Sequence, residues 1–287
     1  MKRLIYEEGK RYIIPTSDWG FKRLFATEDN KDLLIGLLNR VIEGPEIEDL
    51  EYMDRELQLP IASPYGAVLF DVYCRCCDGS RIIVEMQNYA STRFLDRAIV
   101  YTAASILEGF IKNDRGEYNV QRTYLIAITG TKMFPEVEIA PVKLGLCGLN
   151  VPGRPLLSDK VLQIFIELPK FAGEVEALRP EDGFLEKFAV ALKTMNDSDE
   201  RPDVMDDDYL VRLYKAADLH RYSEQERNEY QQAVMNSLEY KATLIDYKLE
   251  GRAEALLETA RKMKANGIPL EMIAKCTDLD AETLASL

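Results

Sequence analysis

Residues 70–87 read FDVYCRCCDGSRIIVEMQ, and this stretch predicts the β-hairpin that decides the fold. Strands normally fill such positions with β-branched and aromatic residues, yet Asp71 stands early in the first strand and Glu85 in the second. Gln87 follows Glu85 by two residues and so shares its face. Because carboxylates in a strand must be desolvated or paired, two that converge predict an oxygen-rich site for a divalent cation. Such a site suits metal-assisted phosphodiester cleavage.

The length of the hairpin turn decides whether the two carboxylates meet. A two-residue loop, 78–79, would place Asp71 opposite Met86 and point it away from Glu85. A three-residue loop, 77–79, with its glycine in the left-handed conformation, places Asp71 opposite Glu85, with Cβ atoms roughly 5 Å apart. The metal site therefore requires the longer loop or a compensating bulge. The alternative is a solvent-facing hairpin with ordinary surface acids.

Hydrophobic periodicity predicts the elements on both sides of this hairpin. The predicted helices are 17–42, with a break at 26–30, and 90–112. The predicted strands are 47–59, 68–76, 80–87, 122–128 and 162–168. Ser17 or Asp18 caps the first helix.

The second half of the chain changes in character. Prolines and glycines in 131–160 predict loop or irregular structure. From about residue 180 the sequence predicts helices, joined by an acidic connection at 196–208. We therefore expect an α/β core at 1–172 and a helical C-terminal region at 173–287.

Composition limits the class of protein. The chain has 287 residues, 47% of them hydrophobic and 30% charged, which is typical of a soluble globular protein. The longest uncharged apolar run, 98–107, is far shorter than the roughly 20 residues of a membrane span. The N-terminus has no apolar segment of a secretory signal, and five cysteines suggest no disulfide framework. We therefore expect a cytoplasmic protein without a membrane partner.

The charge balance argues against strong generic affinity for nucleic acid, because the net charge is −13. Residues 1–130 carry 16 Lys and Arg against 20 Asp and Glu, and residues 131–287 carry 20 against 29. The acidity is therefore concentrated outside the candidate site. A nuclease is compatible with this balance, although tight non-specific binding through phosphates is not expected.

At the hairpin the chain resembles the PD-(D/E)XK nuclease superfamily, whose hallmark is Asp-x(n)-(Asp/Glu)-x-Lys on a β-hairpin. Here the pattern is Asp71-x13-Glu85-Met86-Gln87. Within the superfamily the chain looks most like the bacterial recombination-promoting nuclease/transposase family. The resemblance runs from about residue 10 to 172, and the stretches that carry it are 11–25, 70–72, 84–87, 96–101 and 166–171.

This resemblance implies an α/β core of four mixed strands flanked by helices, and Mg²⁺-dependent cleavage of DNA, with Mn²⁺ as a substitute. By motif match Asp71 and Glu85 would be metal ligands, and Asp18 would lie near the site. Gln87 stands where the superfamily usually has lysine. Glutamine can orient a water molecule by hydrogen bonding, but it carries no charge and cannot act as a base.

Two further groups have alternative interpretations. Asp18 could simply begin a helix and pair with Lys22 at i, i+4. Arg93, Arg97 and Tyr101 fall on one helical face. If that face looks toward the hairpin, an arginine could supply the charge that Gln87 lacks or hold a phosphate. Otherwise they form an exposed basic stripe.

Other chemistries have weak support in the sequence. The run Cys74-x-Cys76-Cys77 lacks the further ligands of a zinc site. Cys74 and Cys76 share the strand face opposite Asp71 and are expected to be small buried hydrophobic residues. A single histidine, His220, and no Gly-x-Ser-x-Gly motif argue against a catalytic triad. The C-terminus resembles a helix-turn-helix, but its second helix, 280–287, has no Lys or Arg. Packing or self-association, as in a homodimer, is favoured there.

The sequence therefore predicts a Mg²⁺-dependent endodeoxyribonuclease associated with recombination or transposition. Asp71 and Glu85 would hold the cation, Asp18 would complete the site, and Gln87 would orient the attacking water. The competing hypothesis is a nuclease-like fold with weak or absent activity that binds DNA or a protein. Gln87 and the net negative charge support this second hypothesis.

Overall fold

The computed structural model describes residues 9–58, 67–89, 93–112, 118–147 and 156–286. The chain divides into two compact units, Glu7–Tyr230 and a second one that contains Gln231–Leu287. The predicted boundary at residue 172 lies inside the first unit and stays a prediction.

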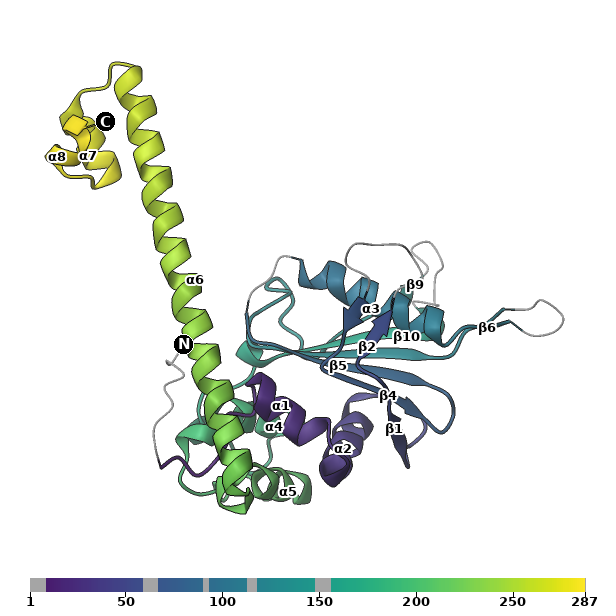
Figure 1. Ribbon diagram of the computed structural model, residues 1–287. Coiled ribbons are helices and arrows are strands. Elements are labelled where there is room, and N and C mark those ends of the chain that lie inside the picture. Colours follow the sequence, from purple (N-terminus) through teal and green to yellow (C-terminus); the bar gives the residue numbers. More distant parts are fainter. Residues whose placement is uncertain (1–8, 59–66, 90–92, 113–117, 148–155, 287) are drawn as a thin grey trace. The chain divides into compact units, whose positions relative to one another are not determined.

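A mixed sheet of six strands forms the centre of the larger unit (Figure 1). The order across the sheet is β1 (Leu50–Tyr52), β4 (Val72–Cys76), β5 (Arg81–Gln87), β8 (Thr123–Thr129), β10 (Leu156–Glu167) and β9 (Val142–Cys147). The three central strands, β5, β8 and β10, are parallel, and the outer pairs are antiparallel. The predicted α/β architecture with a mixed sheet is confirmed, with six strands where the resemblance implied four.

Three of the sequence predictions about strands and loops are wrong. The stretch 68–76 is interrupted after Leu69, so Asp71 lies just before β4 and not within a strand. The stretch 47–59 does not form one strand, because β1 pairs with β4 whereas β2 (Glu56–Gln58) pairs with β3 (Ala67–Leu69) in a separate small sheet. The stretch 131–160 is not simply loop, because it contains β9 and the start of β10. β9 lies at the edge of the sheet, and its register with β10 shifts next to Gly145. Edge strands tolerate proline at their start and glycine at bulges, and these residues hid the strand.

The first predicted helix is confirmed, together with its break. It consists of α1 (Asp18–Phe25) and α2 (Lys31–Val41). The Ser17 hydroxyl caps α1 by accepting a hydrogen bond from Gly20 N at 3.0 Å. The predicted helix over 90–112 is shorter in the structure, because α3 ends at Glu108.

The remaining elements complete both units. α3 is Phe94–Glu108, and β6 (Ile111–Lys112) pairs with β7 (Tyr118–Asn119). The later helices are α4 (Phe184–Thr194), α5 (Asp208–Ala217), α6 (Glu224–Ala265), α7 (Leu270–Thr277) and α8 (Ala281–Ser286). Short 3₁₀ turns occur at Glu28–Asn30, Leu168–Lys170, Val175–Ala177, Met195–Asp197 and Leu219–Arg221.

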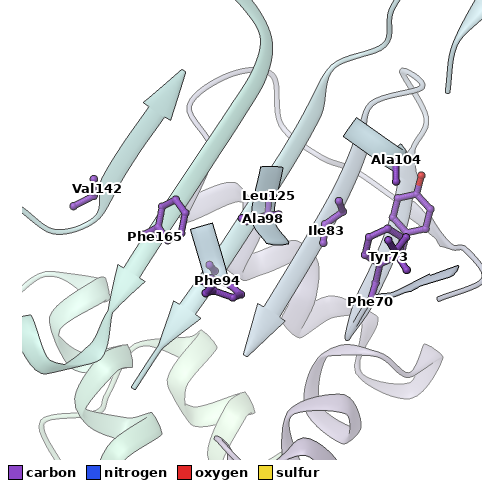
Figure 2. Packing of buried hydrophobic residues seen from close by; sticks show 11 residues of the cluster. Phe70, Tyr73, Ile83, Phe94, Ala98, Ala104, Leu125, Val142 and Phe165 are labelled. Atoms are coloured by element: carbon purple, nitrogen blue, oxygen red, sulfur yellow. The ribbon is translucent and has the colours of Figure 1, made fainter. Parts of the chain in front are cut away.

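The core that positions the hairpin lies between the sheet and α3 (Figure 2). Phe94 and Ala98 of α3 pack with Tyr73 of β4, Ile83 of β5 and Phe165 of β10. Each large apolar side chain buried in this way contributes about 1.5–3 kcal/mol to folding. Figure 1 shows α1, α2 and α4 on the other side of the sheet. The hairpin is therefore covered on both faces.

A helix that crosses a bilayer needs about 20 mostly apolar residues. None of the described helices combines the length and the apolar character that a membrane crossing requires.

Candidate active site

The hairpin turn is the three-residue loop, 77–79. Cys76 N donates to Ser80 O at 2.8 Å, and Gly79 has a φ of +84°, in the left-handed region. The Asp78 carboxylate also accepts bonds from the amide and the hydroxyl of Ser80, both at 2.8 Å. This local chemistry fixes the longer loop. The register that brings the two carboxylates together is therefore confirmed.

Asp71 and Glu85 meet across the hairpin, as this register requires. Val72 pairs with Val84, so the preceding residue, Asp71, lies opposite Glu85. Asp71 N donates to Glu85 Oε1 at 3.1 Å, and Met86 N donates to Asp71 Oδ2 at 2.9 Å. Each carboxylate thus has one oxygen bonded to the other strand. Asp71 Oδ1 and Glu85 Oε2 are the two carboxylate oxygens that these bonds leave out.

Burial makes this pair of carboxylates unusual. Glu85 is 4% exposed, and burial, followed by the charge of Asp71, raises the pKa of its carboxyl to about 8. Burial also raises the pKa of the Asp71 carboxyl, against the opposing effects of the Met86 amide and the Lys22 ammonium. Two neighbouring carboxylates, one buried and one partly buried, are costly to ionise together without a positive partner. Carboxylate oxygens are the kind of ligand that a hard divalent cation prefers.

Gln87 is joined to a cation from the neighbouring helix. Arg97 Nη2 donates to Gln87 Oε1 at 2.5 Å, and Gln87 Nε2 donates to Tyr89 O at 2.9 Å. The Arg97 guanidinium lies over the rings of Phe94 and Tyr101, 4.8 and 5.7 Å from their centroids. The face of α3 that carries Arg97 therefore looks toward the hairpin.

Arg93 stands at the N-terminal cap of α3 and is exposed. It is one helical turn before Arg97, on the same edge of the helix. The structure places it at the surface beside the site. Its contact with a phosphate stays a prediction.

Lys22 links Asp18 to the carboxylate pair. Lys22 Nζ lies 2.5 Å from Asp18 Oδ1 and 3.9 Å from Asp71 Oδ1. The Asp18 side chain is 75% exposed, so its connection to Asp71 runs through the ammonium group. Among the residues that the structure describes, no three or more His, Cys, Asp or Glu side chains gather closely enough to hold a metal ion. The role of Asp18 in completing the site stays a prediction.

Sequence reasoning missed Lys22 as a member of the site. Its spacing from Asp18 is that of an ordinary helical ion pair, which gave no sign of a distant partner. The link comes from tertiary packing: the Asn88 side-chain amide, just after β5, donates to Thr16 O, just before α1. This bond fixes the start of α1 beside the strand that carries Glu85.

The site lies where the parallel strands end, the edge at which open α/β sheets usually bind ligands. Gln87, Thr129 and Glu167 are register partners on β5, β8 and β10. Glu167 is fully buried and accepts bonds from the amides of Met133 and Phe134, at 2.6 and 2.9 Å. Glu167 therefore shapes the rim of the site by holding the loop that follows β8.

Two of the three cysteines in the hairpin are buried packing residues. Cys74 and Cys76 are buried free thiols, as predicted, and they alternate with Tyr73, so they lie on the sheet face opposite the α3 cluster. Burial raises the pKa of the Cys76 thiol to about 12, which keeps it protonated. These residues are small hydrophobic packing residues in this fold.

Comparison with known proteins identified one family. A family model for PD-(D/E)XK nuclease family transposases matches residues 15–246, which includes every residue of the site described above. The curated proteins and the solved structures gave no match to the chain.

Proposed function

The chain belongs to the PD-(D/E)XK nuclease family transposases, and on that premise we propose that it is a divalent-metal-dependent endonuclease that cuts DNA during recombination or transposition. The observation that supports this most directly is the reciprocal bonding of Asp71 and Glu85 across the hairpin. A solvent-facing hairpin would not bury a carboxylate to 4% exposure beside a second one.

Asp71 and Glu85 are the residues that would hold the cation, and Mg²⁺ is the ion we propose, with Mn²⁺ as a substitute. The ion would supply positive charge to the scissile phosphate and acidify the attacking water. Its entry would also favour the deprotonated form of Glu85, whose pKa burial raises to about 8.

The chain itself supplies orientation and further positive charge. Gln87 would orient the water through its amide, in a position fixed by the bond from Arg97. Arg97 would carry the positive charge that the motif lacks, because its guanidinium is held on two rings beside Gln87. Lys22 would add a second charge beside Asp71, with Asp18 holding its ammonium group. Arg93 would contact a DNA phosphate at the rim.

Plasmid cleavage with Mg²⁺ or Mn²⁺ tests the proposal. The variants Asp71→Asn and Glu85→Gln keep the shape of each side chain but weaken its binding to a cation, so we expect both to lose cleavage and metal binding by calorimetry. Glu51→Gln is the matched control, because Glu51 is an exposed acid of the same sheet that pairs with Arg75. Cleavage that survives in both site variants would refute the assignment of the site.

A second function is favoured by one observation, the absence of lysine at Gln87 in an acidic chain with a net charge of −13. In this alternative the fold binds DNA or a protein without cutting. Wild-type protein that neither cleaves plasmid nor binds Mg²⁺ or Mn²⁺, yet shifts DNA in a gel without metal, would support it.

A further inference from the structure

A stripe of apolar side chains runs along α6 at heptad spacing. The residues repeat at intervals of three and four, which is the pattern of a coiled-coil seam. With Met235 as position a, the seam residues are Met235, Leu238, Ala242, Ile245, Leu249 and Leu256. The remaining core position between Leu249 and Leu256 is Arg252.

The helix is covered within its own unit just beyond this stripe, and the middle of the stripe is not covered. Ala260, one turn after Leu256 and beside the seam, is fully buried in a small core with Ile273 of α7 and Leu284 of α8. By contrast, Ile245 and Leu249 are 59% and 60% exposed. Apolar side chains repeated along one line of a helix are typical of an interaction surface.

The charged residues on the two flanks of the seam indicate which partner would cover its apolar side chains. On one flank, position e, stand Glu239 and Asp246, and on the other flank, position g, stand Lys241 and Lys248. In a parallel pair of helices each g residue faces an e residue of the partner, so Lys241 would face Asp246 of a second copy, twice by symmetry. An antiparallel pair would place lysines against lysines and acids against acids.

We propose that α6 forms a parallel two-stranded coiled coil with α6 of a second copy of this chain, over residues 235–256. The seam spans about three heptads, roughly 33 Å of helix. Arg252 at a core position favours two strands, because a larger bundle would bury its charge more completely. The dimer would join two nuclease units in one assembly. That arrangement would suit cleavage of both strands of one duplex. This consequence rests on the proposed function, but the proposal of a dimer does not.

The mass of the full chain in solution tests the dimer, by sedimentation or light scattering over a wide concentration range. We expect twice the chain mass of 32.8 kDa. Ile245→Asp with Leu249→Asp should give the monomer while circular dichroism stays unchanged. The matched control is Tyr240→Asp with Tyr247→Asp, because these residues are 61% and 66% exposed on the outer face of the same helix. The control should stay dimeric.

Several results would overturn the proposal. They are a monomeric or tetrameric wild type, a seam variant that remains dimeric, and a control variant that becomes the monomer. Each of these results comes from the mass in solution. The test of the dimer is therefore independent of whether the wild type cleaves DNA.

The orientation has its own test. In a parallel seam a core residue meets its own copy, so Ala242→Cys should form an intermolecular disulfide on mild oxidation. Thr243→Cys, on the outer side, should not. The parent chain run beside them accounts for its exposed Cys77 and Cys276. Lys241→Glu should weaken the dimer about tenfold, and adding Asp246→Lys should restore it. Failure of the disulfide, or of the rescue, would exclude the parallel arrangement.

Discussion

Arg97 Nη2 lies 2.5 Å from Gln87 Oε1, so the amide that ends the Glu-x-Gln motif is bonded to a permanent cation. A superfamily lysine would place its charge on the strand itself. Here the strand supplies the hydrogen bond and α3 supplies the charge. The first prediction follows from this separation of the hydrogen-bonding group, Gln87, from the charged group, Arg97.

We expect Arg97→Met to lower the rate of DNA cleavage by about 10²-fold, because a fixed positive charge near the scissile phosphate stabilises the transition state. Gln87→Lys alone should not raise the rate, since the new ammonium would lie against Arg97 and repel it. Gln87→Lys in the Arg97→Met chain should recover part of the lost rate. Single-turnover cleavage of a plasmid measures all three, and equal effects of Gln87→Lys in both backgrounds would contradict the coupling.

Lys22 gives a second prediction. Lys22→Met removes the ammonium group 3.9 Å from Asp71 Oδ1, so the cleavage rate should fall by roughly tenfold or more, while Lys22→Arg should retain most of it. Asp18→Asn should have a smaller effect, because Asp18 acts by holding Lys22. Lys31→Met is the control, since Lys31 on α2 pairs with Glu28 and Asp49 and not with the site. Loss of activity in the control would point to a general charge effect.

The raised pKa of Glu85 predicts how stability depends on pH without metal. The folded chain holds the Glu85 proton to a pKa of about 8, whereas the unfolded chain releases it near 4.5. The unfolded state therefore binds fewer protons between these values, and stability falls as pH rises through this window. The loss is on the order of a few kcal/mol and should level off above pH 8. Denaturant titration at several pH values in EDTA measures it.

Glu85→Gln is the informative variant for this titration. Its amide does not ionise, so the fall in stability between about pH 5 and pH 8 should shrink in this variant. At pH 9 the variant should be more stable than the wild type in EDTA, and less stable once Mg²⁺ is added, because only the wild type retains the ligand. Parallel pH curves for the two chains would mean that Glu85 does not titrate in this range.

Gly79 carries the fourth prediction. Its φ of +84° is costly for a residue with a side chain, and a Cβ there would lie 3.2 Å from Gln121 Oε1. Gly79→Ala should therefore destabilise the fold by about 1–2 kcal/mol. Gly173→Ala is the control, because a Cβ at Gly173 meets no atom within 4 Å. Thermal unfolding compares them, and equal stability would mean that the turn tolerates another conformation.

The sequence predicted the contacts between residues close together in the chain better than the contacts between distant elements. The hairpin could be reduced to two registers, because alternation along a strand fixes which residues share a face. The sequence did not choose between them, since Asp78 and Gly79 suit both loop lengths. The choice appears in the bonds that the amide and hydroxyl of Ser80 donate to the Asp78 carboxylate.

Contacts that depend on how whole helices and strands pack together could not be predicted from the sequence. The rotation of α3, which aims Arg97 at Gln87, follows from burying Phe94 and Ala98 against the sheet. Periodicity marked the apolar side of that helix but not the strand beneath each residue. Similarly, β9 was hidden because an edge strand carries the prolines and glycines that usually signal loop.

The bond from the Asn88 side chain to Thr16 O also sets the helical phase of the site. It fixes where α1 begins, and an α-helix turns by about 100° with each residue. One residue inserted between Asp18 and Lys22 would swing the ammonium group to another side of the helix. The same insertion after Phe25, where the helix is already broken, would leave Lys22 beside Asp71. The distance along the chain from Thr16 to Lys22 is therefore as much a part of the site as the side chains themselves.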